Sequence, residues 1–316
     1  MIAWIFPGQG TQKVGMGRAL CSASPAARAV FEAADEALGE AFSRLVFEGP
    51  AEQLTYTANA QPAILTASVA ALAALREAQP QLPAPQVAAG HSLGEYSALV
   101  AAGALDFRRA VQLVRVRGEA MQRAVAPGEG AMAAMIGGDA AAVQQLCADV
   151  SAELGGGRLV SPANFNAPGQ VVIAGHAAAV ERAAALAKDR KLKAIPLKVS
   201  APFHCSLMAP AAAALERALR EVEFGPLHFP VVSNVEAAPN ADPARVRELL
   251  VRQVAGAVRW QETLEWMSGH GVQTAWEIGP GQVLAGLAKR TVPALVVRPA
   301  FEPEEVSAIA ASSRPS

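Results

Sequence analysis

Ser92 is the residue of this chain whose surroundings most clearly predict covalent chemistry. It is the centre of a Gly-x-Ser-x-Gly pentapeptide at 90–94, between an apolar segment at 86–89, predicted to be a short buried strand, and a predicted helix at 95–102. A serine at such a sharp strand-to-helix turn has a strained backbone, and glycines flank it because side chains there would collide with the neighbouring strand and helix. The turn points the hydroxyl toward the first free N–H groups of the helix, which can bind an oxyanion. The motif predicts that Ser92 is a nucleophile.

A serine hydroxyl needs a base to accept its proton, and His204 has the most suggestive surroundings among the five histidines. It follows a predicted strand at 193–199 and precedes a helix, so it can face a cleft. His91 adjoins Ser92, but adjacent residues on a tight turn point apart. Surface positions are expected for the other three, which are His176, His228 and His270. The residues alone leave open whether His204 is the base or an ordinary loop histidine.

Two further segments could contribute to a site. The loop at 6–12 is rich in glycine, and the glycines around Gln9 allow a backbone donor to approach a reaction centre or simply make a tight connection. This loop lacks the Gly-Lys pair of a phosphate-binding loop, which disfavours nucleotide binding. Arg117 lies on a largely apolar helix, where arginines are usually solvated, although a buried one would clamp a carboxylate with two parallel hydrogen bonds. The residues alone favour the solvated position.

Alternating elements in the first half of the chain must position these residues. A strand is predicted at 4–6, and helices are predicted at 26–38, 61–77 and 107–125, with Pro62 in the first helical turn. Strands that alternate with helices favour a mostly parallel sheet covered on both faces.

The segment Pro-Gly-Glu-Gly at 127–130 interrupts this alternation, and a different order of strands and helices follows it. The predicted elements that follow are a strand at 131–136, a helix at 139–154 with Asp139 as N-cap, strands at 159–164 and 170–174, a helix at 177–189 and a strand at 193–199. This β-α-β-β-α-β order is ferredoxin-like. We therefore predict an α/β chain with a catalytic domain at 1–127 and 199–316 and an inserted ferredoxin-like subdomain at 128–198. The large sheet resumes at 230–234 and 273–278.

Composition limits the class of protein. The 316 residues are 52% hydrophobic and 17% charged with a net charge of −1, which gives no bulk electrostatic reason to bind nucleic acid or a membrane. Three cysteines without C-x-x-C spacing, and no metal-ligand cluster among the histidines, disfavour a disulfide framework or a metal site. The apolar N-terminus is expected to be a strand rather than a signal peptide, and the Ala-rich stretch at 67–75 is too short to span a bilayer. A cytoplasmic location is expected.

Taken together, these segments resemble the malonyl-CoA:acyl carrier protein transacylases over almost the whole chain. The matching segments are Phe-Pro-Gly-Gln-Gly at 6–10, Gln-Pro-Ala at 61–63, Gly-His-Ser-Leu-Gly-Glu-Tyr at 90–96, Arg-Gly at 117–118, Asn-Phe-Asn-Ala-Pro-Gly-Gln at 164–170, Phe-His at 203–204, Val-Arg-Gln at 251–253 and Glu-Ile-Gly-Pro-Gly at 277–281. The resemblance implies an α/β-hydrolase-like domain with a ferredoxin-like insertion, in agreement with the pattern above.

The resemblance also implies catalytic roles. Ser92 and His204 would form a dyad, with the imidazole oriented by the carbonyl of Gln253 rather than by a carboxylate. Hydrolases place the acidic residue of a Ser-His-Asp triad between the serine and the histidine, but no acidic residue between Ser92 and His204 has the sequence surroundings of such a triad member. The oxyanion would be bound by the backbone N–H groups of Gln9 and Leu93.

Substrate selection follows from two other matched positions. Arg117 corresponds to the residue that pairs with the malonyl carboxylate, so an uncharged acyl group would leave a buried guanidinium unpaired. Phe203 corresponds to a bulky residue that crowds an α-methyl branch, a discrimination worth about 1–3 kcal/mol.

The implied reaction is ping-pong and needs no bound cofactor. Malonyl-CoA is the substrate, and the acceptor is the phosphopantetheine thiol of an acidic acyl carrier protein, with the enzyme as a monomer. Candidate docking residues are Lys289, Arg290 and the basic cluster of Lys188, Arg190, Lys191, Lys193 and Lys198.

Several alternatives remain open from the sequence. A thioesterase or other hydrolase uses the same elbow, and a non-catalytic subunit that binds the carrier is a different class. Within the acyltransferases, a fatty-acid enzyme is favoured over a free-standing enzyme that loads a polyketide synthase, and the loading subunit of malonate decarboxylase shares the chemistry.

Overall fold

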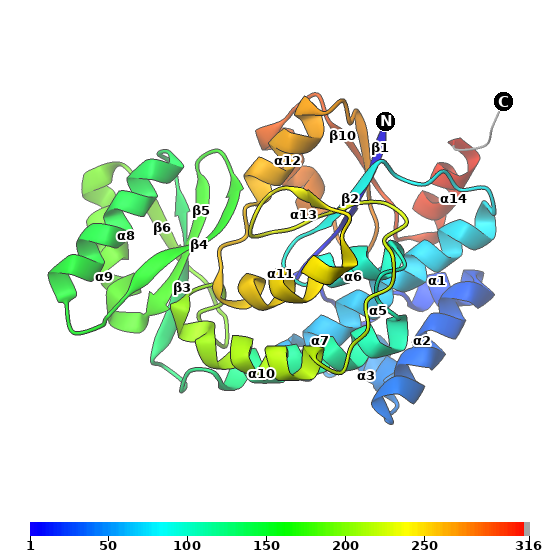
Figure 1. The fold of residues 1–316 in the computed structure, drawn as a ribbon, viewed down its shortest axis with the longest axis horizontal. Coiled ribbons are helices and arrows are strands. Elements are labelled where there is room, and N and C mark those ends of the chain that lie inside the picture. Colours follow the sequence, from blue (N-terminus) through cyan, green and yellow to red (C-terminus); the bar gives the residue numbers. More distant parts are fainter. Residues whose placement is uncertain (313–316) are drawn as a thin grey trace.

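Two β-sheets organise the chain, and the computed structural model describes residues 1–312 of it (Figure 1). The larger sheet has the order β10-β9-β1-β2-β7-β8. Its strands are β1 (Ile2–Phe6), β2 (Val87–Gly90), β7 (Val231–Val232), β8 (Pro239–Asn240), β9 (Thr274–Glu277) and β10 (Val296–Pro299). Every pairing is parallel except that of β7 with β8, which is antiparallel. The predicted mostly parallel sheet is confirmed.

Helices cover both faces of this sheet because successive side chains of a strand point in opposite directions. Trp4 and Phe6 belong to the larger apolar cluster, whereas Ala3 and Ile5 pack in a second cluster with α12 and α13. The helices outside the small sheet are α1 (Arg18–Ala23), α2 (Pro25–Leu38), α3 (Phe42–Glu48), α4 (Ala51–Thr55), α5 (Thr57–Ala78), α6 (Gly94–Ala101), α7 (Phe107–Arg123), α10 (Ala209–Leu219), α11 (Pro243–Ala255), α12 (Trp260–Gly269), α13 (Val283–Thr291) and α14 (Pro303–Ser312).

The smaller sheet lies at one end of the molecule and is antiparallel throughout (Figure 1). Its elements are β3 (Gly130–Ile136), α8 (Ala140–Leu154), β4 (Val160–Ala167), β5 (Gln170–His176), α9 (Ala177–Ala187) and β6 (Lys193–Pro196), with strand order β4-β5-β3-β6. Asp139 caps α8 by accepting a hydrogen bond from the Ala142 N–H. The ferredoxin-like order is thus observed, while the domain boundaries at 127/128 and 198/199 stay predictions.

Helix α5 differs from its sequence-based prediction. It begins at Thr57, so Pro62 lies inside the helix and not in its first turn. Tertiary packing explains the longer helix, because Gly118 of α7 lies against that first turn, where a Cβ atom would be 2.7 Å from the Thr57 carbonyl oxygen. With 22 residues, α5 is long and apolar enough to cross a membrane by length and composition, contrary to the expectation from 67–75, but 83% of its most apolar window is buried inside the protein.

The strand predicted at 230–234 is also shorter than expected. β7 contains only Val231 and Val232, because the chain then turns and returns as β8. Asn234, in this turn, forms hydrogen bonds to the segment around Ser92, which take the place of further strand pairing.

Candidate active site

The turn between β2 and α6 has the strained geometry that the pentapeptide predicts. Ser92 has a φ of 52°, in the left-handed region that non-glycine residues rarely adopt. A Cβ atom on Gly90 would lie 1.8 Å from the carbonyl carbon of Gly94, and one on Gly94 would lie 2.1 Å from the Phe6 carbonyl oxygen. Both glycines are therefore required for the approach of β1, β2 and α6.

His204 reaches Ser92 from a distant part of the sequence. Its Nε2 atom lies 2.7 Å from Ser92 Oγ, and its Nδ1 atom lies 2.9 Å from the backbone carbonyl oxygen of Gln253. A carbonyl oxygen only accepts hydrogen bonds, so Nδ1 carries the proton and Nε2 presents its lone pair to the serine hydroxyl. This is the tautomer that a general base requires.

The environment of His204 keeps its imidazole neutral. The side chain is buried, and this burial, followed by the nearby charge of Arg117, lowers its pKa to about 3. No carboxylate is hydrogen-bonded to this ring in the part of the chain that the structure describes, and the orienting group is a backbone carbonyl. His91 points elsewhere, as predicted: its Nε2 atom lies 2.8 Å from Asn166 Oδ1.

Arg117 is buried at the site, so the solvated position favoured by its sequence context is wrong. Only 1% of the residue is exposed. Its guanidinium donates to Gln61 Oε1 at 2.7 Å, to Gln253 Oε1 at 2.9 Å and to Ser92 Oγ at 3.2 Å. The close packing of α7 on α5 at the adjacent glycine turns this helix face inward. Burial lowers the pKa of Arg117, but a guanidinium remains charged in proteins.

A cavity of about 610 Å³ opens above these groups. It is lined by Ser92, His204 and Arg117 together with Phe203, Gln9 and Leu93. Within residues 1–312, the backbone N–H groups of Gln9 and Leu93 donate no hydrogen bond. The Gln9 side chain donates to Thr57 Oγ1 at 3.1 Å, which fixes the loop at the cavity edge. All six predicted residues at the reaction centre therefore share one cavity, and Gln253 lies directly behind it.

Three residues without a predicted role complete the polar core behind Ser92. Asn234 Oδ1 accepts from the Ser92 backbone N–H at 2.7 Å, and Asn234 Nδ2 donates to the Gly90 carbonyl at 2.7 Å. Glu95 accepts from Gln253 Nε2 at 2.8 Å, and Gln61 contacts Arg117. Gln61 and Glu95 lie in segments that carry the family resemblance, and Glu95 is also a charged residue at the start of an otherwise apolar helix, whereas Asn234 gave no sequence signal.

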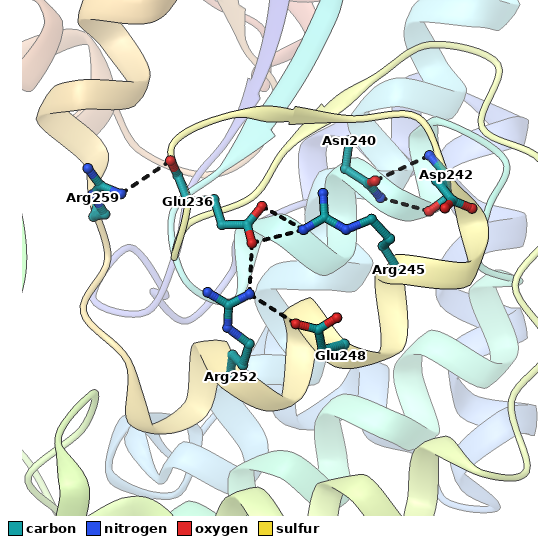
Figure 2. Close-up of polar contacts among 7 residues, drawn as sticks. All are labelled: Glu236, Asn240, Asp242, Arg245, Glu248, Arg252 and Arg259. Carbon is teal, nitrogen blue, oxygen red and sulfur yellow. Dashed lines mark hydrogen bonds and ion pairs between the residues drawn. The ribbon is translucent and has the colours of Figure 1, made fainter.

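An ion-pair network next to the site connects the turn that contains Asn234 to the helix that contains Gln253. Figure 2 shows Glu236, in the turn between β7 and β8, facing Arg245 and Arg252 of α11. The Arg245 Nη2 atom lies 2.9 Å from both carboxylate oxygens of Glu236, and Arg252 Nη1 lies 2.7 Å from one of them. These ion pairs therefore fix the β7–β8 turn, with Asn234, against α11, with Gln253.

The predicted docking residues are away from the reaction centre, with one exception. Lys289 and Arg290 are exposed on α13, and Arg290 Nη1 donates to Gln170 Oε1 at 2.6 Å. Within the basic cluster, Lys198 lines the cavity, whereas Arg190 pairs with Asp149. Residues 1–312 contain no group of three or more potential metal ligands.

Comparisons with known proteins find relatives along almost the whole chain. The acyl transferase domain family matches residues 3–310. Proteins named malonyl CoA-acyl carrier protein transacylase are 49% identical in Bacillus subtilis, over 96% of this chain and 95% of that protein, and 46% identical in Escherichia coli K12, over 97% of both.

Solved structures show the same likeness. A malonyl transacylase in complex with a type II polyketide-synthase acyl carrier protein superposes with a TM-score of 0.94 at 44% identity, covering 98% of this chain and 99% of that one. An acyl carrier protein S-malonyltransferase from Vibrio cholerae superposes with a TM-score of 0.93 at 46% identity, with the same coverage.

Proposed function

Because the chain belongs to the acyl transferase domain family, we propose that it moves the malonyl group of malonyl-CoA onto the phosphopantetheine thiol of an acyl carrier protein. The observation that carries this proposal is the buried guanidinium of Arg117, 3.2 Å from Ser92 Oγ. A fixed cation so close to the nucleophile favours an acyl group with a negative charge near the reacting carbonyl. In a malonyl group a single methylene separates the carboxylate from that carbonyl.

In the first half-reaction, Ser92 Oγ attacks the thioester carbonyl carbon of malonyl-CoA while its proton passes to His204 Nε2. The carbonyl oxygen becomes an oxyanion, for which the backbone N–H groups of Gln9 and Leu93 are the proposed donors. The C–S bond breaks as the carbonyl re-forms, and the imidazolium returns its proton to the CoA sulfur. CoA leaves and Ser92 carries a malonyl ester.

The second half-reaction reverses these steps with a different thiol. His204 accepts the proton of the phosphopantetheine thiol, whose sulfur attacks the ester carbonyl carbon. The C–O bond to Ser92 breaks, and the imidazolium protonates Ser92 Oγ. The carrier protein leaves as a malonyl thioester. No bound cofactor takes part in this scheme.

Selection of the acyl group depends on Arg117 and Phe203. The malonyl carboxylate would accept hydrogen bonds from the Arg117 guanidinium, whereas an acetyl group would leave that buried charge without an anionic partner. Phe203 lines the cavity beside His204 and would crowd an α-methyl branch, which is worth about 1–3 kcal/mol.

The same geometry is compatible with a thioesterase, which differs in the fate of the acyl-enzyme. The buried cation that lines the cavity beside Ser92 supports transfer of malonyl over hydrolysis of an uncharged acyl thioester. A backbone carbonyl behind His204, in place of a carboxylate, supports an acyl-enzyme that outlasts attack by water.

Fatty-acid synthesis is the proposed pathway, and loading of a polyketide synthase is the alternative. The named bacterial relatives support malonyl transfer to an acyl carrier protein, and the polyketide carrier complex supports the alternative. The proposal places the enzyme in the cytoplasm as a monomer. An acidic carrier protein would dock on exposed basic side chains, for which Lys289 and Arg290 on α13 and, separately, Lys198 at the cavity are the candidates.

A discharge experiment tests the proposal. The protein is incubated with malonyl-CoA, freed of excess substrate, and then mixed with buffer, with the apo carrier protein or with the holo carrier protein. We expect a malonyl-enzyme that persists in buffer and with the apo carrier but passes its malonyl group to the holo carrier. Rapid loss of the label in buffer would instead establish a hydrolase. Parallel reactions with methylmalonyl-CoA and acetyl-CoA measure selectivity.

A further inference from the structure

Two buried charges behind Ser92 are joined through one amide. Glu95, Gln253 and Arg117 are 3%, 0% and 1% exposed. The Gln253 Oε1 atom accepts from Arg117 Nη2 at 2.9 Å, and its Nε2 atom donates to Glu95 Oε2 at 2.8 Å. The amide therefore connects the carboxylate to the guanidinium and leaves other guanidinium N–H groups for a ligand.

Hydrogen-bond chemistry fixes the orientation of this amide from both sides. The Gln253 Nε2 atom also donates to the Ser92 carbonyl oxygen at 2.8 Å, so both of its hydrogens have acceptors. A half-turn of the amide would place its oxygen against two acceptor oxygens and its nitrogen against a guanidinium, which can only donate. Glu95 supplies one of the two acceptors that forbid this half-turn.

Glu95 is itself held rigidly. Its Oε2 atom accepts from the backbone N–H of Asn234 at 3.0 Å, and the residue lies in the first turn of α6, where a helix favours a carboxylate. Burial raises the pKa of Glu95 to about 7, against smaller lowering effects of Gln253, Asn234 and Arg117. An oxygen acceptor is present in both protonation states, so its hold on the amide does not require the charge.

We propose that Glu95 is a positioning residue for acyl-group selection, which acts through the Gln253 amide to keep the Arg117 guanidinium directed at the acyl position above Ser92. The inference rests on the proposed function, because it concerns the preference for malonyl over acetyl. Without an acceptor at Glu95 the amide keeps only the Ser92 carbonyl oxygen as an acceptor for its N–H groups, so its orientation toward Arg117 is held less firmly.

Two substitutions separate positioning from charge. Glu95→Gln keeps an acceptor oxygen, whereas Glu95→Met removes it at similar length. The readout is the ratio of the Ser92 acylation rates with malonyl-CoA and acetyl-CoA. We expect Glu95→Gln to keep this ratio within about threefold of the wild type and Glu95→Met to lower it at least about tenfold, mainly through the malonyl rate.

Glu277→Gln is the matched control. Glu277 is a second fully buried carboxylate with a pKa raised to about 7 by burial, but it accepts from the backbone N–H groups of Leu284 and Ala285, outside the cavity lining. Its neutralisation should leave the selectivity ratio unchanged. In an Arg117→Ala background, Glu95→Met should produce no further fall in the ratio, because its effect passes through Arg117.

The outcomes are distinct. A Glu95→Met protein that loses both acylation rates equally, or neither, overturns the inference, and so does a Glu95→Gln protein that falls as far as Glu95→Met. If Glu95→Met does not fold, Glu95→Ala takes its place, since it also removes the acceptor and leaves Gln253 intact: a fall in the ratio supports the inference and an unchanged ratio overturns it. Failure of the proposed function would appear earlier, as a wild-type protein that takes no malonyl group.

Discussion

The Nη2 atom of Arg117 lies 3.2 Å from Oγ of Ser92, so a buried cation directly adjoins the hydroxyl of the proposed nucleophile. The His204 imidazole contacts the same oxygen at 2.7 Å. Under the proposed function, acyl recognition and bond formation therefore take place side by side at Ser92 Oγ. The monothioester of a short dicarboxylic acid suits this arrangement, because its carboxylate can meet the guanidinium while its carbonyl carbon faces Ser92.

Arg117→Ala should convert the enzyme from a malonyl-selective to an unselective one. We expect Ser92 acylation by malonyl-CoA to fall about 10²–10³-fold, since loss of one partner of a buried charge pair costs about 2–5 kcal/mol, while acylation by acetyl-CoA changes less than about tenfold. Arg115→Ala on the same helix is the control, because Arg115 pairs with Glu40 and Asn59 outside the cavity. Equal losses for both substrates in Arg117→Ala would contradict this role of Arg117.

The pH dependence of acylation should lack the protonation step of an ordinary histidine. Since burial lowers the pKa of His204 to about 3, its imidazole stays neutral as the pH falls through 6.5 and becomes protonated only in strong acid. We expect the single-turnover rate of Ser92 acylation to change less than about twofold between pH 7.5 and 5.5, whereas a base with a pKa of about 6.5 would lose most of its activity over that range. An acid limb centred near pH 6.5 would refute the neutral buried base.

Glycine at position 94 should be indispensable for folding. A Cβ atom there would overlap the Phe6 carbonyl oxygen of β1, so Gly94→Ala should lose more than about 4 kcal/mol of unfolding free energy or fail to fold. At Gly286 in α13, by contrast, an added Cβ atom would meet no heavy atom within 4 Å beyond its chain neighbours and the adjoining helix backbone, and Gly286→Ala should gain about 0.5–1 kcal/mol of unfolding free energy. Urea unfolding measures both, and an unchanged midpoint for Gly94→Ala would contradict the close approach.

Local patterns are sufficient to predict the elbow, the small sheet and four strands of the large sheet, but not its edge strands β8 and β10. Ser92 lies in a contiguous motif, and the alternation of strands and helices determines the parallel sheet and the ferredoxin-like order. Short elements such as α3 and α4 are not predictable in this way because their few apolar positions give no clear period. The start of α5 differs from its prediction because packing against Gly118, rather than local propensity, extends the helix past Pro62.

Whether the sequence can predict a site residue depends on whether the residue's partners are near it in the sequence or only in the folded structure. His204 and Arg117 have open alternatives in the sequence, since sequence alone cannot show which helix face is buried or which loop reaches Ser92. Asn234 has no detectable signal because its partners are backbone groups of the distant β2–α6 turn. Glu95 is visible as an isolated charge, but its link to Gln253 exists only in three dimensions.

Charge reversal at Lys289 and Arg290 should weaken only the second half-reaction. We expect the double variant Lys289→Glu, Arg290→Glu to raise the apparent KM for an acidic carrier protein at least about fivefold and to leave acylation by malonyl-CoA intact, because like charges oppose encounter. The effect should shrink at high salt. Unchanged carrier kinetics would exclude this surface as the docking site.

Mapping the acyl-enzyme tests the central claim most directly. After brief incubation with malonyl-CoA and digestion, mass spectrometry should locate one malonyl group on the peptide that contains Ser92, and Ser92→Ala should carry none. Cys205 is the informative competitor, since it follows His204 but burial raises the pKa of its thiol to about 11. A malonyl group on Cys205, or one that persists in Ser92→Ala, would contradict the proposed Ser92–His204 dyad.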